Sequence, residues 1–241
     1  MEGLEGKRSI VKRSLENLEA KTTQVSRQGQ IQNISDDRSQ YNEGTEALDG
    51  IMLTVQPRPF TVTEYHRMSE LEILALGERT ELLDGQIIVM AAKGTAHSSA
   101  TTLTQDLLRE QLGRRVFVRS QEPIHLSDDS EPEPDVVLAV RDSLAYSTHH
   151  PTVAEVLLAI EVADSSLKYD LEVKAIAYAR AGILDYWVLD VVDRRLHVFR
   201  QPDQGVYQSQ AILAETLEIT PIAFPDCTLS IREMLPPIAT C

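Results

Sequence analysis

The segment VLLAIEVADSSLKYDLEVKAIAYARAG, residues 156–182, decides the fold because it joins a buried strand to a helix. Its first seven letters form an apolar run of the length of a buried strand, interrupted only by Glu161. Residues 170–182 then predict a helix that ends at Gly182. Because a carboxylate is costly to bury without a partner, Glu161 raises the question of which cation neutralises it.

The flanking sequence predicts a mixed α/β (α+β) domain around a central sheet rather than an alternating, doubly wound fold. Asp84-Gly85 indicates a tight hairpin between two short apolar runs. Of Tyr186 and Trp187, neighbours on a predicted strand, we expect one to face the core. Helices are predicted at 61–76, with a capping box, and at 94–113, and further strands at 116–120, 121–126, 134–140, 185–190, 194–200 and 205–213, before a turn-rich end with a short helix.

Composition restricts the class of protein. The 241 residues are 42% hydrophobic, enough to build a core, and carry a formal net charge of −14. Such acidity argues against a general nucleic-acid coating role, because that binding depends on Lys and Arg. Two cysteines without metal or redox spacing predict a reducing, cytoplasmic location. No apolar run reaches the ~20 residues that span a bilayer, so we expect no membrane partner.

Residues 1–50 differ from the rest of the chain. They are polar, rich in Gln, Ser and Asn, and show no sustained period of 3.6 or 2. This pattern predicts a disordered or weakly ordered extension. Met52 is an alternative start, which would leave the extension untranslated. Residues 51–241 are expected to form a single domain.

Three polar residues occupy places where a strand or core is normally apolar. Asp135 precedes the run VVLAV, Glu161 ends the next buried run, and Lys174 lies on the following helix, sharing one helical face with Asp170 and Tyr178. Two carboxylates at neighbouring strand ends repel each other, and Mg²⁺ relieves that repulsion while binding substrate phosphates. The arrangement therefore predicts a phosphodiester hydrolysis site in which an ammonium positions the attacking water.

Each residue also has a simpler interpretation. Glu161 could face solvent at a strand edge, and Asp135 could be a turn residue after the Pro-containing dipeptides. Lys174 could form an exposed pair with Asp170, worth only about 0.3–0.5 kcal/mol. Taken singly, these interpretations are favoured. The ordered set of Asp, Glu and Lys on strand, strand and helix favours the metal site.

The same motifs carry a resemblance to a known family. PEPDVVLAV and IEVADSSLKYDLEVKAIAYARAGILDYWVLD resemble the Uma-two family of restriction-endonuclease-like proteins in the PD-(D/E)xK nuclease superfamily. The upstream segments TVTEYHRM, ERTELLDGQIIVM and GTAHSSATTLTQDLLREQL extend the likeness, which covers roughly residues 58–215. The resemblance implies a restriction-endonuclease-like central mixed sheet flanked by helices and places residues 51–241 in one PD-(D/E)xK nuclease-like domain. Relatives are often dimers, so it also implies a homodimer.

The resemblance assigns site residues position by position. Asp135 and Glu161 match the metal-binding acids, and the third position, two residues after the Glu, holds Ala163 where the superfamily has Lys. Lys174 is the residue that would replace that lysine from the helix, and Glu81 matches an acid at the edge of the site or is a simple hairpin residue. Gln121 and His97 also match family positions, His97 as a structural residue, a phosphate contact or a ligand. Asp170 would orient Lys174, and Ser166 would bond the loop backbone.

The leading functional hypothesis is an endonuclease that acts on DNA and depends on Mg²⁺ or Mn²⁺. In it, Asp135, Glu161 and the carbonyl of Val162 hold the metal, and Lys174 assists the attacking water. The alternative is a non-catalytic protein that keeps the nuclease fold for binding or assembly, which the acidic composition and Ala163 favour. A hydrolase of another phosphoester is a third possibility.

Overall fold

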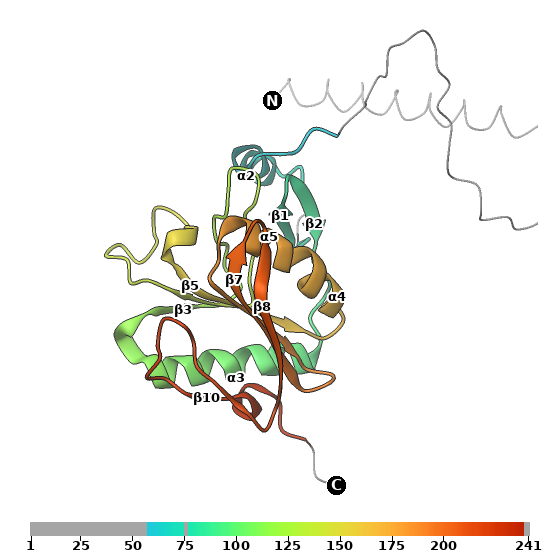
Figure 1. The fold of residues 1–241 in the computed structure, drawn as a ribbon. Coiled ribbons are helices and arrows are strands. Elements are labelled where there is room, and N and C mark those ends of the chain that lie inside the picture. Colours follow the sequence, from blue (N-terminus) through green and yellow to red (C-terminus); the bar gives the residue numbers. More distant parts are fainter. Residues whose placement is uncertain (1–56, 75–76, 239–241) are drawn as a thin grey trace, which may run out of the picture. The chain divides into compact units, whose positions relative to one another are not determined.

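The centre of the protein is a six-stranded mixed sheet in the order β3-β4-β5-β6-β7-β8 (Figure 1). The structure, a computed structural model, describes residues 57–74 and 77–238; the extension expected at 1–50 lies outside them. Only β5 and β6 run parallel, and every other neighbouring pair is antiparallel. The strands are β3 (Phe117–Arg119), β4 (Val136–Ala139), β5 (Val156–Ala163), β6 (Asp185–Asp190), β7 (Arg195–Asp203) and β8 (Val206–Ala214).

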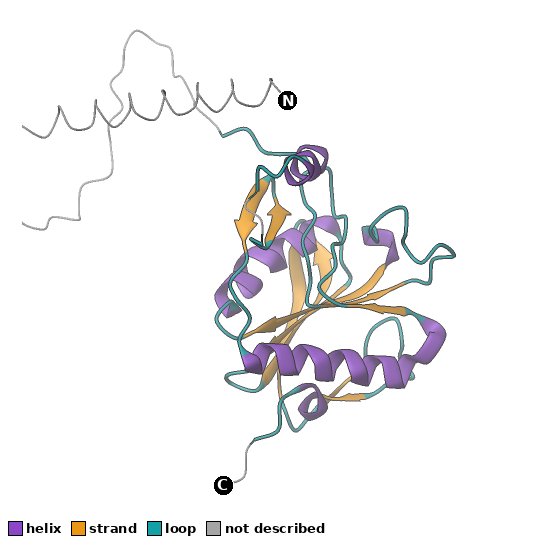
Figure 2. Cartoon of the chain, turned by 180° about the vertical axis from the view of Figure 1, so that it is seen from behind, coloured by secondary structure: helices purple, strands orange, loops and turns teal. Residues whose placement is uncertain are grey.

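The parallel pair β5–β6 requires a crossover, which the quoted segment provides. It consists of α4 (Leu167–Tyr169), a π-helical turn η3 (Asp170–Lys174) and α5 (Ala175–Ala181). The predicted helix end is confirmed: Gly182 caps α5 with φ of 94°, a left-handed conformation that glycine adopts without strain. The crossover covers one face of the sheet, and α3 (Thr95–Leu112) covers the other (Figure 2).

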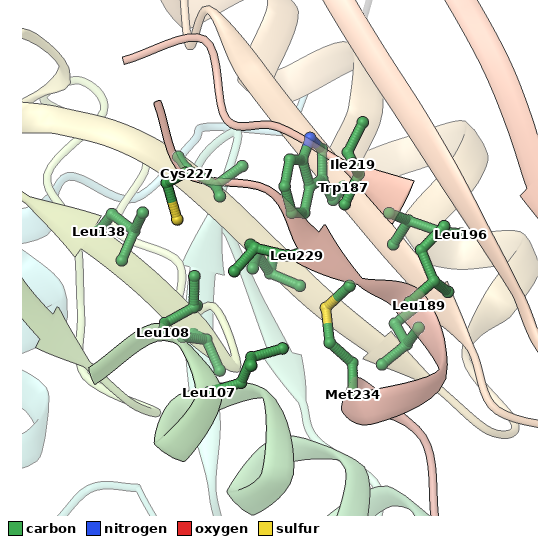
Figure 3. Packing of buried hydrophobic residues seen from close by; sticks show 14 of the residues in the cluster. Leu107, Leu108, Leu138, Trp187, Leu189, Leu196, Ile219, Cys227, Leu229 and Met234 are labelled. Atoms are coloured by element: carbon green, nitrogen blue, oxygen red, sulfur yellow. The ribbon is translucent and has the colours of Figure 1, made fainter. Parts of the chain in front are cut away.

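Alternation along β5 divides its side chains between the two faces. Leu158, Ile160 and Val162 belong to the core on the α3 side, which Figure 3 shows with residues of the C-terminal segment. Ala159 and Ala163 belong to the core under the crossover, where small side chains let the helix approach closely. Glu161 lies between these two alanines in sequence, so the period of two directs it toward the crossover helix.

Both aromatic residues at the start of β6 are buried. Trp187 belongs to the core on the α3 side and Tyr186 to the core under the crossover, and each is 0% exposed. The Trp187 indole nitrogen donates to Asp185 at 2.7 Å, and the Tyr186 hydroxyl donates to the Asp170 carbonyl at 3.0 Å. The expected core-facing aromatic side chain is present, and the second one is buried as well, because strand β6 is covered on both faces.

The remaining elements complete the domain. They are α2 (Val62–Glu70), the hairpin β1 (Thr80–Leu83) and β2 (Gln86–Val89), the pair β9 (Glu218–Ile219) and β10 (Leu229–Ser230), and the 3-10 turns η1 (Gly113–Arg115), η2 (Val153–Glu155) and η4 (Ile231–Met234). The predicted capping box of Thr61 and Glu64 is present. In the described ranges 57–74 and 77–238, no helix is long and apolar enough to cross a membrane.

One predicted helix is shorter than expected, and one predicted strand is absent. The helix expected at 61–76 ends at Glu70, where Leu71 caps it. The strand expected at 121–126 is absent, and only His125 forms a single bridge, to Thr152. Gln121 has a positive φ of 57°, which breaks an extended strand. Pro123 cannot donate to a strand ladder.

The predicted hairpin turn is confirmed at Asp84 and Gly85, which have φ of 49° and 70°. Gly85 also lies against the chain that enters α2: its carbonyl accepts from the Phe60 amide at 2.9 Å. A Cβ at Gly85 would lie 2.2 Å from the Pro59 Cβ. Glycine is therefore required here by both conformation and space.

Gly85→Ala is expected to lower the free energy of unfolding by about 2 kcal/mol, because it adds a steric clash to an unfavourable φ. Urea denaturation measures the change. Gly205→Ala is the matched control, since its φ of 79° imposes similar strain while its nearest contact is 3.9 Å away. Equal destabilisation by both variants would show that the contact with Pro59 contributes nothing.

Candidate active site

Strand pairing brings Asp135 and Glu161 together. β4 pairs with β5 through Val136 and Ile160, so the next step of this antiparallel register places Asp135 opposite Glu161. Directly opposed residues project to the same face of a sheet. Both line a cleft of ≈ 290 Å³ whose other walls come from the hairpin, the start of α3 and the start of the crossover.

Three groups donate hydrogen bonds to the Asp135 carboxylate. Oδ2 accepts from the Val162 amide at 2.9 Å and lies 3.0 Å from His97 Nε2, and Oδ1 accepts from Gln121 Nε2 at 3.2 Å. Burial raises the pKa of Asp135, but the bonds from His97 and Val162, together with the charge of Lys174, outweigh it and hold that pKa below its usual value. Asp135 is therefore ionised at neutral pH.

Glu161 is held by two donors from the crossover helix. Its Oε1 accepts from Lys174 Nζ at 3.0 Å and from the Tyr178 hydroxyl at 2.9 Å. Lys174 is therefore the cation that neutralises the buried carboxylate of Glu161. The simpler interpretation of Glu161 as a solvent-facing edge residue does not apply, since only 3% of the residue is exposed.

Lys174 is a buried cation between two carboxylates. Its Nζ lies 3.0 Å from Glu161 Oε1 and 3.0 Å from Glu81 Oε2, and the side chain is 1% exposed. Burial lowers its pKa, but the carboxylates of Glu161 and Glu81, with Asp170, outweigh burial and hold the pKa well above its usual value. The lysine lies in the π-helical turn η3, a distortion often found at functional sites.

Glu81 reaches the site from the hairpin, which folds over the crossover. Its Oε2 also accepts from the Glu133 amide at 3.1 Å. Its Oε1 is buried without a hydrogen-bond partner among the residues that the structure describes. Glu81 is thus a hairpin residue on β1, and its fully buried side chain also contacts Lys174.

Asp170 and Ser166 bond to each other instead of performing their expected roles. Ser166 Oγ donates to Asp170 Oδ2 at 2.6 Å, rather than to the loop backbone. Burial raises the pKa of Asp170 to about 6, while Lys174 and Ser166 oppose that shift. Asp170 contributes charge near Lys174, but no direct ion pair between the two is present in the described part of the chain.

Negative charge is in excess at this site. Four carboxyl groups, those of Glu81, Asp135, Glu161 and Asp170, surround one ammonium, and burial together with the other acids raises the pKa of Glu161 well above its usual value, against the effect of Lys174. The carboxylates of Asp135 and Glu161, which both line the cleft, supply hard oxygen donors that fit Mg²⁺ or Mn²⁺, which needs only one or two protein carboxylates. Within ranges 57–74 and 77–238, no three His, Cys, Asp or Glu side chains form a ready-made metal cluster.

Sequence reasoning missed several residues of the cleft. Arg79, Lys93 and Asp164 line it together with the expected acids. Arg79 donates to Glu133 at 2.9 Å. Lys93 lies in the loop between β2 and α3, where the letters AAKG show no motif. Only its position, directly before a helix that carries His97, could have drawn attention to it.

Comparisons with known proteins agree with this geometry. A family model, Uma2, described as "Putative restriction endonuclease", matches residues 62–232. A nuclease of the DUF820 group from Anabaena variabilis, described as putative, has a similar solved structure with a TM-score of 0.57 and 16% sequence identity. The similarity covers 73% of this chain and 97% of that one, and shows the fold. No curated protein matches.

The family match spans most of the described chain, and its range includes Glu81, His97, Asp135, Glu161 and Lys174. The expected restriction-endonuclease-like mixed sheet is confirmed by the six strands and by the solved structure. Family membership supports a nuclease function in general terms. This chain belongs to the Uma2 family of restriction-endonuclease-like proteins.

Proposed function

We propose that the protein is a metal-dependent endonuclease that hydrolyses phosphodiester bonds of DNA. The observation that carries this proposal is the pair of buried carboxylates, Asp135 and Glu161, opposed on adjacent antiparallel strands and opening into one cleft. Asp135, Glu161 and the carbonyl of Val162 would hold Mg²⁺ or Mn²⁺. The cation would supply positive charge to the phosphoryl oxygens and lower the pKa of a water in the site.

The chain's own residues orient these groups. His97 and Gln121 fix both oxygens of Asp135, and Tyr178 and Lys174 fix one oxygen of Glu161. An ammonium has three N–H donors, and Lys174 uses two on Glu81 and Glu161. Lys174 also lines the cleft, and its third N–H would hold the attacking water. Glu81 acts through Lys174 and is a positioning residue.

Hydrolysis at this site would form one bond to phosphorus and break another, with no net change in the number of protons. The water oxygen bonds to phosphorus, and the bond between phosphorus and the leaving deoxyribose oxygen breaks. The water loses one proton to solvent, and the leaving oxygen gains one from solvent. Lys174 orients the incoming water and Glu161 keeps Lys174 in place, so positioning supplies part of the rate enhancement.

Glu161→Gln tests metal binding. We expect the dissociation constant for MgCl₂ or MnCl₂, measured by isothermal titration calorimetry, to rise at least about 100-fold, because removing a ligand should exceed the effect of losing an outer hydrogen bond. The glutamine carbonyl can still accept from Lys174 and Tyr178, so the fold should persist.

Glu172→Gln is the matched control on the crossover helix, since its side chain is 63% exposed and outside the cleft. Its metal affinity should equal that of the wild type. If the wild type binds neither cation, the endonuclease proposal fails and the non-catalytic alternative gains support.

A further inference from the structure

The proposed reaction places negative charge on a phosphate, yet the lysine of the site is already neutralised. Lys174 is 1% exposed and lies between two carboxylates at 3.0 Å. Ala163, at the position where related nucleases have lysine, is fully buried in the core under the crossover. Neither residue offers an uncompensated positive charge to a substrate in the cleft.

Lys93 also lines this cleft. It belongs to the loop between β2 and α3 and lines the cleft with Asp135 and Glu161. The loop is packed close to the end of β5, because a Cβ on Gly94 would lie 2.9 Å from Asp164 Oδ2. The backbone beside Lys93 is thus held near the two acids.

The ammonium of Lys93 is not committed to a protein carboxylate. Among the described residues it forms no ion pair within 4.0 Å, whereas Arg79 and Lys174, which also line the cleft, pair with Glu133 and with Glu81 and Glu161 respectively. Partial burial, with a smaller effect of Arg79, lowers the pKa of Lys93 below its usual value, although Asp135, Glu133 and Glu161 oppose that decrease. Lys93 is a half-buried residue of the cleft wall without an ion pair among the described residues, so its ammonium can pair with an anionic group that enters the cleft.

We propose that Lys93 contacts a non-bridging oxygen of the scissile phosphate and stabilises the charge that develops there. This inference rests on the proposed endonuclease function and assigns its substrate contact to the loop rather than to the crossover helix. Lys174 and Lys93 then have separate tasks: Lys174 holds the water, and Lys93 binds the phosphate. Lys93 forms no covalent bond and transfers no proton, so the bond balance is unchanged.

Lys93→Met tests the proposal in the full-length protein. We expect plasmid cleavage in MgCl₂ to slow about 100-fold, as when one preorganised donor to a developing charge is removed. Metal affinity by calorimetry should stay at the wild-type value, and Lys93→Arg should restore most of the activity. Lys168→Met is the control, since that lysine is 85% exposed and outside the cleft.

A second measurement separates the substrate contact from catalysis. Binding of a fluorescent DNA duplex is followed by anisotropy in CaCl₂ at several salt concentrations. Loss of one phosphate contact should weaken binding in Lys93→Met and reduce the salt slope by about 1. Lys168→Met should match the wild type.

The outcomes distinguish this inference from the proposed function. Equal cleavage by wild type and Lys93→Met overturns the inference and leaves the endonuclease proposal standing. If the wild type does not cleave, the endonuclease proposal fails. DNA binding then decides about Lys93: weaker binding by Lys93→Met supports the phosphate contact, and equal or absent binding overturns it.

Discussion

Asp135→Asn is expected to reduce plasmid cleavage in MgCl₂ by about 10³-fold, because the substitution removes one of the two opposed charges that would hold the cation. The fold should survive. An asparagine oxygen can accept from the Val162 amide as Oδ2 does now, and the Gln121 amide can turn to accept from the new NH₂ group. The loss would therefore report on chemistry rather than on unfolding.

Three measurements make this result decisive. Circular dichroism and urea denaturation should show that Asp135→Asn remains folded, and calorimetry should show weakened metal binding. Asp226→Asn is a suitable control, because Asp226 is an exposed partner of Arg115 far along the chain from the site. Cleavage that survives Asp135→Asn at the wild-type rate would point to a contaminating nuclease and contradict the assignment.

Lys174→Met is expected to lower the free energy of unfolding by about 3–5 kcal/mol, since breaking a buried ion pair leaves uncompensated charge. Here two carboxylates, Glu81 and Glu161, lose their common partner. Chemical denaturation measures the change. Lys168→Met, which removes only an exposed pair with Glu172, should stay within about 0.5 kcal/mol of the wild type.

The free energy of unfolding of Lys174→Met is expected to decrease as the pH rises. Without the ammonium, burial raises the pKa of Glu161 further above its unfolded value, so the folded state binds more protons than the unfolded state. Stability then falls as pH rises through the folded pKa, and the variant should recover part of its loss in acid. A double variant with Glu81→Gln should also recover part of it. An unchanged denaturation midpoint in Lys174→Met would contradict the buried triad.

Much of the fold follows from local sequence signals. The Asp84-Gly85 turn, the capping box of Thr61 and Glu64 and the glycine at 182 each specify a backbone conformation that neighbours cannot override. The strand expected at 121–126 does not form, because Gln121 has a positive φ that an extended strand does not allow. With Pro123 unable to donate, the segment instead bonds to Pro132 and Pro151 carbonyls through single residues.

Several residues of the candidate site could be predicted from the sequence, whereas the contacts between them could not. Asp135, Glu161 and Lys174 stand out because they interrupt apolar patterns or fall on a helix after a buried strand. Their partners could not be inferred in the same way. The ion pair of Lys174 with Glu81 joins residues 93 positions apart in sequence. Lys93 carries no pattern at all, and only the shared cleft relates it to the acids.

The sequence alone predicted the strand, helix and strand of residues 156–190, the family likeness and the carboxylate in the buried strand, because periodicity and turn chemistry act over a few residues. Only the tertiary structure decided that register places Asp135 opposite Glu161, that Lys174 is neutralised between two acids, and that Lys93 faces the cleft uncommitted. The physical reason is that strand register and the closure of distant loops depend on packing between elements, which no local pattern records.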